Sequence, residues 1–276
     1  MSAIDRDAAV YRALGTTFAM MSDQLPLLQL LDALWIHCET NLAAEHLIEV
    51  VSTPDGFVVG IDGVETARHL ETSVVVSRVV WEINQLARNS LPKHALLHAA
   101  LVQIGDRGVV VCGPSGSGKS TLTAKLVELG AVYLGDEIVA IDNGAPQCGA
   151  YLKPLTLRRG SWEFVESLVP DCGPDQAEYL RDTWFVTPRF VASTTTVALV
   201  VHTQYSPGAE TRGIAIEATE NAVMMCEQTH HLASSGERAF RAVCQFARSV
   251  AAMRLVVNDL DVASSLIARA STWTPS

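Results

Sequence analysis

The sequence predicts an α/β fold in two parts, a smaller α+β accessory region over residues 1–90 and a larger core over residues 91–276. Apolar runs rich in β-branched residues alternate with segments of helical spacing, which is typical of mixed α/β proteins. A glycine-rich loop at residues 113–121 stands directly between such a run and such a segment. Turn-forming residues around Pro92 separate the two parts.

Composition excludes several classes of protein. The chain has 276 residues, of which 49% are hydrophobic and 18% are charged, so it is not a low-complexity disordered sequence. The formal net charge of −10 disfavours a nucleic-acid partner, because such binding depends on many basic contacts to phosphate. No apolar stretch supplies the roughly 20 residues of a membrane helix. We expect a cytoplasmic chain with no signal peptide, no membrane partner and no nucleic-acid partner.

The six cysteines are scattered along the chain and form no CxxC pair. In a cytosolic chain of this length, such cysteines are typical of small buried thiols. We therefore expect neither a disulfide framework nor a zinc site from them.

In the accessory region the sequence predicts two helices and two clear strands. The apolar run at 25–36 suits a helix, and the apolar spacing of three and four over 73–88 predicts an amphipathic helix. Alternating runs at 46–52 and 56–61 predict strands joined by a turn.

The core begins with a predicted hairpin, formed by apolar runs at 96–104 and 109–112. If residues 106 and 107 make the two-residue turn, His98 falls opposite Ser115, beside the glycine-rich loop. A histidine there would orient a carboxylate or contact a phosphoryl group. The alternative is a core histidine that is satisfied by a backbone partner.

Strands and helices continue to alternate downstream of the loop. Gly130 stands where a helix C-cap glycine is expected. The segment at 163–182, rich in Pro, Gly and acids, is either a substrate loop or a connection. Strands are predicted at 131–135, 138–142 and 194–202, and helices at 122–129, 217–229 and 237–253.

Residues 113–120 match the phosphate-loop pattern G-x-x-x-x-G-K-[ST] at every fixed position. Glycines let successive backbone N–H groups point into one concavity, and the following helix adds its positive partial charge. Lys119 would reach the β- and γ-phosphates, and the Ser120 hydroxyl would ligate Mg²⁺. The alternative, a glycine-rich turn without a ligand, is disfavoured by the flanking strand and helix. The nucleotide-binding candidates are Gly113, Pro114, Ser115, Gly116, Ser117, Gly118, Lys119, Ser120 and Thr121.

Asp136 and Glu137 form an acidic pair at the end of the next predicted strand. The interval after Ser120 has room for only one helix, one turn and one strand. A β-α-β crossover would set this strand parallel to the one at 109–112, with both carboxyl ends at the edge where ligands bind. One carboxylate would then hold a metal, while the other accepts a proton from an attacking hydroxyl. Solvated loop acids are the alternative interpretation.

Residues 96–142 resemble the catalytic core of HPr kinase/phosphorylase, a family of P-loop serine kinases structurally related to phosphoenolpyruvate carboxykinase. The family has a histidine before the loop strand, a GxSGxGKS loop and an adjacent acidic pair, and this chain has His98, the loop and Asp136-Glu137 at the corresponding places. The resemblance implies an ATP- and Mg²⁺-dependent kinase. It implies that Asp136 is the general base, helped by His98, with Lys119 on the phosphates and Ser120 and Glu137 on Mg²⁺. Glu137 replaces the family's usual second aspartate.

The resemblance covers about a sixth of the chain, and it weakens downstream. The family's ExRGxG signature has no match here. Residues 151–161 are instead similar to a KPLxLxxGS stretch in stand-alone HPr-kinase-like proteins, some of which accompany ribosomal-peptide pathways such as lasso peptides. This favours a serine-type hydroxyl of a peptide or peptide natural-product precursor as acceptor, with the accessory region binding it. The resemblance also implies a homo-oligomer.

Two other functions stay open: a small-molecule alcohol kinase, and a non-catalytic ATP-dependent regulatory or binding module. His230 and His231 have no metal-ligand companion at a recognisable spacing, so we expect a surface pair at a helix end. Four cations are candidates for contacts to substrate or phosphate, with solvated loop cations as the alternative: Lys153, Arg158, Arg189 and Arg212.

Overall fold

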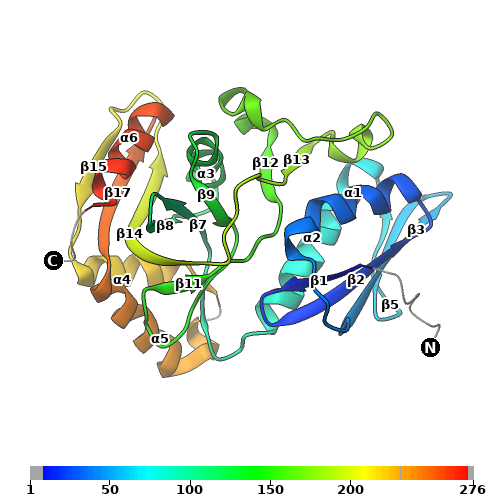
Figure 1. The fold of residues 1–276 in the computed structure, drawn as a ribbon, viewed down its shortest axis with the longest axis horizontal. Coiled ribbons are helices and arrows are strands. Elements are labelled where there is room, and N and C mark those ends of the chain that lie inside the picture. The colour runs from blue at the N-terminus through cyan, green and yellow to red at the C-terminus, as the bar shows by residue number, and fades with distance from the viewer. Residues whose placement is uncertain (1–8, 231, 273–276) are drawn as a thin grey trace. The chain divides into compact units, whose positions relative to one another are not determined.

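The computed structural model describes residues 9–230 and 232–272, and the chain divides into two compact units (Figure 1). The first contains Met1–Leu91, Leu152–Trp162 and Val169–Thr187, and the remaining residues form the second. Residues 152–162 and 169–187 were expected in the core, and this expectation is corrected. Two of their elements, at residues 177–180 and 183–186, pack against the helix at 72–89, which groups these segments with the first unit.

A five-stranded sheet forms the centre of the first unit. Strands β2 and β3 pair in parallel, and the other neighbouring strands pair antiparallel. The predicted strands at 46–52 and 56–61 are confirmed as β3 and β4. The strand order is β1 (Val10–Ala13), β2 (Thr16–Ser22), β3 (His46–Thr53), β4 (Gly56–Ile61) and β5 (Val64–Leu70).

Two helices pack against this sheet, and both were predicted. Val76, Val79 and Ile83 are fully buried, so the spacing of three and four does mark the face of the second helix that enters the core. The elements are α1 (Leu25–Trp35), η1 (Ile36–Cys38) and α2 (Thr72–Asn89), with the antiparallel pair β12 (Leu155–Arg158) and β13 (Thr183–Val186). Three short 3₁₀ helices lie between β12 and β13: η2 (Arg159–Phe164), η3 (Glu166–Leu168) and η4 (Ala177–Leu180). Of these, η3 and η4 fall within the predicted loop at 163–182, and η3 belongs to the second unit.

The second unit is built on a seven-stranded mixed sheet. β14 pairs in parallel with β8 on one side and with β17 on the other. β8 and β9 are each antiparallel to β7, which lies between them, so they run parallel to each other as expected. The strand order is β15 (Arg212–Ala215), β17 (Ala251–Val257), β14 (Thr194–Tyr205), β8 (Arg107–Cys112), β7 (Ala99–Ile104) and β9 (Val132–Gly135), and β11 (Gln147–Gly149) also pairs with β14.

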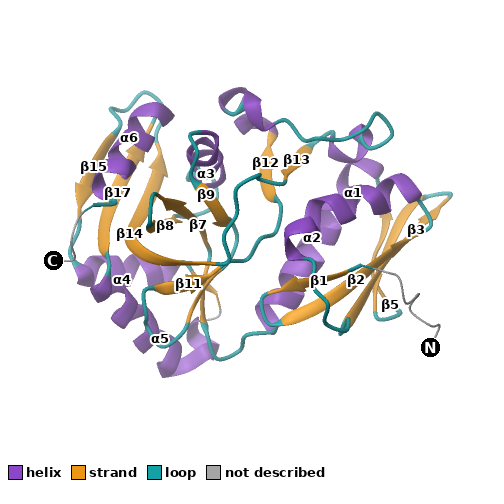
Figure 2. Cartoon of the chain, in the orientation of Figure 1, coloured by secondary structure: helices purple, strands orange, loops and turns teal. Residues whose placement is uncertain are grey.

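Helices cover both faces of this sheet (Figure 2). Along β8, Val109 and Val111 pack on the face covered by α3 and α6, while Val110 and Cys112 pack on the face covered by α4 and α5. A strand buried on both faces explains why residues 109–112 are continuously apolar. The helices are α3 (Lys119–Glu128), α4 (Ala218–Glu227), α5 (Leu232–Ser249) and α6 (Leu260–Ala270); a small second sheet consists of β10 (Val139–Ile141), β6 (Ala95–Leu97) and β16 (Thr229–His230).

The hairpin exists, but its predicted register is wrong. Ile104 faces Arg107, so the turn consists of Gly105 and Asp106, and Gly105 takes the positive φ of 61° that the first turn position favours. β7 starts only at Ala99, which faces Cys112. The apolar run breaks between β6 and β7 at His98, which therefore does not lie opposite Ser115.

The predicted helix at 237–253 is also too long. α5 ends at Ser249, and Ala251–Val257 forms β17 between β14 and β15. Alanine favours helices in isolation, but here pairing on both sides of the strand overrides that propensity. The other predicted strands and helices of this unit are confirmed to within a few residues, and Gly130 has the positive φ of 97° expected after a helix end.

The cysteines of the described residues are free thiols. Burial raises the pKa of the Cys38, Cys112 and Cys148 thiols to about 12, which confirms buried thiols at these positions. Cys172, Cys226 and Cys244 are only partly buried. None of the described helices combines the length and apolarity that crossing a bilayer requires.

Candidate functional site

The glycine-rich loop joins the end of β8 to the start of α3. Gly113, Gly116 and Gly118 all have positive φ, of 150°, 81° and 88°. At Gly113 a Cβ would lie 2.5 Å from Ser117 Oγ and 2.6 Å from the carbonyl oxygen of Thr203, so only glycine fits there.

The loop is held by its own backbone and by the end of β14. Ser117 N–H donates to the Pro114 carbonyl at 3.1 Å. The Ser117 carbonyl accepts from Tyr205 N–H at 3.1 Å and from the Thr203 hydroxyl at 3.4 Å. These bonds fix the loop while Pro114, Ser115 and Gly116 stay exposed.

The start of α3 can take an anion. The Leu122 N–H donates to the Gly118 carbonyl at 2.9 Å, and N–H groups that precede such a first bond have no acceptor inside their helix. These free N–H groups form the positive end of the helix dipole, which points toward the exposed loop. Ser120 lies in this first turn and is half-buried.

Lys119 is folded onto the loop. Its Nζ donates to the carbonyls of Gly113 at 2.6 Å and Pro114 at 3.2 Å, and the residue is 7% exposed. Burial lowers the pKa of the Lys119 ammonium, while Glu137 and Asp136 act in the opposite direction. The ammonium is thus within electrostatic reach of both carboxylates.

The acidic pair follows β9 directly. Asp136 is 4% exposed, and its Oδ1 accepts a 3.1 Å hydrogen bond from the Tyr133 hydroxyl. Glu137 is half-buried. The two neighbours therefore differ in environment, which is what separate roles would need.

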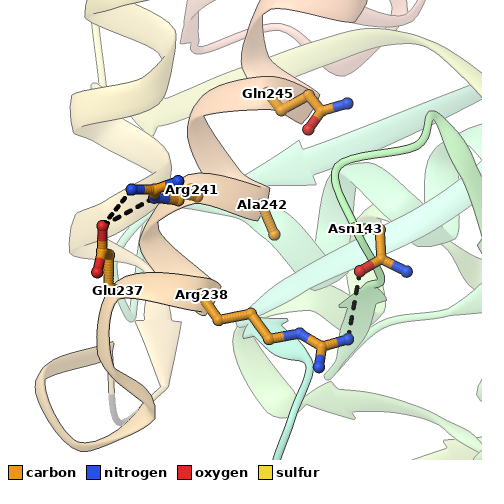
Figure 3. Close-up of a pocket in the computed structure, with 6 residues that line it drawn as sticks. All are labelled: Asn143, Glu237, Arg238, Arg241, Ala242 and Gln245. Carbon is orange, nitrogen blue, oxygen red and sulfur yellow. Dashed lines mark hydrogen bonds and ion pairs between the residues drawn. The ribbon is translucent and has the colours of Figure 1, made fainter.

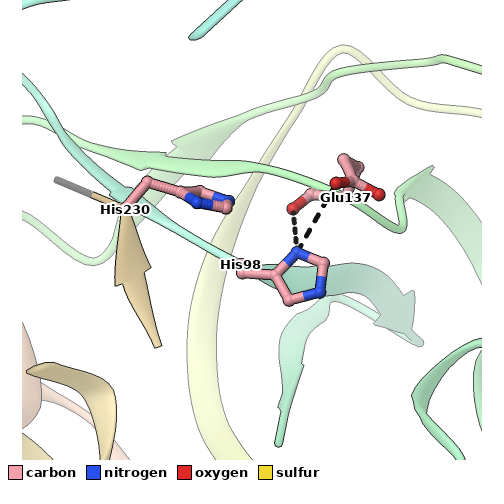
Figure 4. Close-up of side chains that lie close together, drawn as sticks. All are labelled: His98, Glu137 and His230. Carbon is pink, nitrogen blue, oxygen red and sulfur yellow. Dashed lines mark hydrogen bonds and ion pairs between the residues drawn. The ribbon is translucent and has the colours of Figure 1, made fainter. Parts of the chain in front are cut away.

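His98 contacts Glu137 rather than the loop (Figure 4). His98 Nδ1 lies 3.2 Å from the Glu137 carbonyl oxygen and 3.6 Å from its Oε1. Burial is the main cause that lowers the His98 pKa; Lys119 lowers it further, while Glu137 and Asp136 raise it. His98, Lys119, Asp136 and Glu137 thus form one interacting cluster.

His230 corrects the expectation of a surface pair. It is half-buried on β16, faces Leu96 of β6, and has its ring centroid 5.4 Å from that of His98. Pairing of β16 with β6 carries it there, and no local spacing could have revealed that. His231 lies outside the described residues.

The four candidate cations lie in different places. In the first unit, Lys153 is 1% exposed and its Nζ donates to the Pro154 carbonyl at 2.9 Å and the Thr156 hydroxyl at 3.0 Å, while Arg158 is exposed. In the second unit, exposed Arg189 precedes Phe190, whose carbonyl accepts from Tyr133 N–H. Exposed Arg212 lies on β15, which β17 and β14 separate from β8.

A cavity of about 450 Å³ lies elsewhere in the second unit, beside α5 (Figure 3). Arg238 donates to Asn143 at 3.2 Å, and Arg241 pairs with Glu237. No residue of the phosphate loop is among its lining residues. The lining residues are Asn143, Glu237, Arg238, Arg241, Ala242 and Gln245.

The residues present fit a magnesium-bound nucleotide. A hydroxyl at the start of α3 and a half-buried carboxylate after β9 are oxygen donors, which Mg²⁺ prefers, and the exposed loop with its helix start suits phosphate. Ser120 and Glu137 as metal ligands stay predictions. Tyr133 was not predicted, because an ordinary strand tyrosine carries no motif.

Comparison with known proteins finds a weak structural similarity. No known protein family and no curated protein matches the chain. Among solved structures, the Hpr(Ser) kinase/phosphatase from Coxiella burnetii matches with a TM-score of 0.31 and 12% identity, over 63% of this chain and 91% of that chain. That likeness is too low to assign the chain to a family or to an activity.

Proposed function

We propose that the chain is an ATP- and Mg²⁺-dependent kinase that transfers the γ-phosphoryl group to a serine-type hydroxyl of a peptide or peptide natural-product precursor. The observation that carries the proposal is the arrangement of the sheet. Lys119 is folded onto the phosphate loop after β8, and the acidic pair Asp136-Glu137 follows β9, which runs parallel to β8 with β7 between them. The resemblance of residues 96–142 to HPr-kinase cores supports the same chemistry.

In this mechanism the loop N–H groups and Lys119 hold the phosphates, and Ser120 and Glu137 would hold the metal. Mg²⁺ would offset the charge that develops on the phosphate oxygens. The acceptor oxygen forms its bond to the γ-phosphorus as the bond to the bridging oxygen breaks, and ADP leaves with that oxygen. The acceptor's proton passes to the Asp136 carboxylate.

Two side chains would position the base and the metal ligand. Tyr133 holds the Asp136 carboxylate through its hydroxyl. His98 holds the segment after β9 through the Glu137 carbonyl. His98 would therefore help Asp136 by placing the acidic pair.

Contacts to the acceptor would come from exposed cations. Arg158, Arg189 and Arg212 are exposed and would suit an acidic or phosphorylated group. The Lys153 ammonium is bonded within its own turn, so we give it a structural role instead. We propose that the protein acts in the cytoplasm as a homo-oligomer and that the accessory region binds the acceptor.

The proposal is tested by incubating the protein with γ-³²P-labelled ATP, Mg²⁺ and separated peptide and small-molecule fractions of the source cells. Label in the peptide fraction supports the proposal, and label only in the small-molecule fraction supports an alcohol kinase. Nucleotide binding without any transfer indicates a regulatory or binding module. A chain that binds no nucleotide would overturn all three functions.

A further inference from the structure

We propose that His98, Glu137 and His230 form a binding site for a divalent first-row transition metal ion of the zinc class. Within the described residues, these three side chains each offer a ligand atom, and the three atoms all lie within 4.8 Å of one another (Figure 4). This cation is different from the Mg²⁺ of the proposed kinase reaction, and its binding needs no nucleotide.

The three ligands come from separate segments that backbone bonds hold together. His230 of β16 faces Leu96 of β6, two residues before His98. The His98 N–H donates to the Gln228 carbonyl at 2.8 Å, which ties the same two segments a second time. Glu137 lies two residues before Val139 of β10, which pairs with Leu97 of β6. The cluster is therefore assembled by strand pairing, and not by long flexible side chains.

The spacing is close to that of a coordination shell. Ligand atoms about 2.0–2.1 Å from a tetrahedral zinc lie about 3.3 Å from one another. His98 Nδ1 and Glu137 Oε1 are already 3.6 Å apart. To ligate the ion, Nδ1 gives up its proton and its hydrogen bond to the Glu137 carbonyl, so the metal replaces that contact. The His98 and His230 rings meet at 64° with centroids 5.4 Å apart. The three ligand atoms lie within 4.8 Å of one another, so they would draw together to about 3.3 Å when an ion binds.

The donor set selects the class of ion. Two imidazole nitrogens and one carboxylate oxygen suit Zn²⁺ and Co²⁺, whereas Mg²⁺ prefers oxygen ligands throughout. The side chains of His98 and Glu137 are 29% and 27% exposed, so the site is shielded and still admits a water as fourth ligand. Glu137 has two carboxylate oxygens, so one oxygen can serve this ion while the other serves Mg²⁺.

The test is Co²⁺ titration of the full chain after chelator treatment, without nucleotide or Mg²⁺, followed by visible absorption. We expect one equivalent of Co²⁺ to give the weak bands of nitrogen and oxygen ligation, and Zn²⁺ to displace it. His230→Gln and Glu137→Gln should each weaken binding about tenfold or more. His94→Gln is the matched control, since His94 is a half-buried histidine of the same unit that lies 4.0 Å from Asp142 and outside the cluster; it should bind like the wild type.

Four results would overturn the proposal. They are the absence of Co²⁺ binding by the wild-type chain, wild-type affinity in His230→Gln, displacement of Co²⁺ by an excess of Mg²⁺, and intense thiolate absorption. The last result would place the ion at cysteines, of which Cys226 and Cys244 lie near each other. Circular dichroism melts of each variant separate loss of the site from loss of the fold. Kinase activity enters none of these readouts, so the metal site and the proposed function fail independently.

Discussion

The hydroxyl of Tyr133 donates a 3.1 Å hydrogen bond to Oδ1 of Asp136, three residues further along the chain. Tyr133 is 1% exposed and Asp136 is 4% exposed, so the bond is shielded from water. A bond in such surroundings restricts the carboxylate to one orientation. Tyr133 is therefore a positioning residue for the proposed base.

Tyr133→Phe should keep the fold and nucleotide binding but lower kcat about tenfold, because one hydrogen bond of about 1.4 kcal/mol is lost. Steady-state kinetics with ATP checks this through the separation of kcat from KM. A purely structural role predicts instead that the melting temperature falls while kcat of the folded enzyme is unchanged.

Lys119→Ala should weaken ATP binding roughly 10- to 100-fold, since a charged hydrogen bond to phosphate contributes about 1.5–3 kcal/mol. Titration with a fluorescent ATP analogue measures the effect. Lys125→Ala is the matched control, because Lys125 lies on the same helix but pairs with Glu128 and Asp261. Equal affinities in the two variants would remove Lys119 from the nucleotide site.

Gly113→Ala should lower the free energy of unfolding by about 3 kcal/mol, because its Cβ would meet the Thr203 carbonyl and Ser117 Oγ. Gly105→Ala is a control at another positive φ, of 61°, where a Cβ would meet nothing within 4 Å, and it should cost about 1 kcal/mol. Urea unfolding of both variants gives the comparison. Equal losses would mean that the close approach of the loop to β14 is not present in solution.

Stability should fall as the pH drops below 6.5, and His202 should contribute to the fall. His202 is 4% exposed and bonded to Asn221 at 2.8 Å, and burial lowers its pKa from the usual 6.5. Below pH 6.5 the unfolded chain therefore binds a proton at His202 that the folded chain does not bind. This lowers the free energy of unfolding by up to about 1.4 kcal/mol for each pH unit.

Urea unfolding at pH 7.5 and 5.5 tests this expectation, with His202→Gln as the variant. The variant should lose less free energy of unfolding than the wild type over this interval. Some pH dependence of stability should persist in the variant, because the pKa of His98 is also lowered in the folded chain. Equal losses of free energy of unfolding in the variant and the wild type would contradict a contribution of His202.

Local patterns predicted much of the fold. The period of α2, the continuous apolar run of β8 and the fixed positions of the phosphate loop each depend on neighbouring residues, and the structure has these elements. The N-cap of α6 was missed although it is also local, since Asp259 accepts from the N–H groups of Asp261 and Val262.

Pairing between distant segments was not predictable in the same way. The hairpin register depends on which glycine takes the positive φ, and the strand β17 is specified by β14 and β15 rather than by its own alanines. His230 reaches His98 only because β16 pairs with β6. The positioning role of Tyr133 follows only from the hydrogen bond of its hydroxyl to Asp136, which no local sequence pattern indicates.

Whether Asp136 is the general base is decided by γ-phosphoryl transfer in Asp136→Asn, measured beside wild type and beside Asp142→Asn, a change at a half-exposed acid outside the cluster. We predict that Asp136→Asn binds ATP like the wild type and transfers phosphate on the order of 10³-fold more slowly, while Asp142→Asn is unaffected. Transfer at the wild-type rate by Asp136→Asn would rule out Asp136 as the general base.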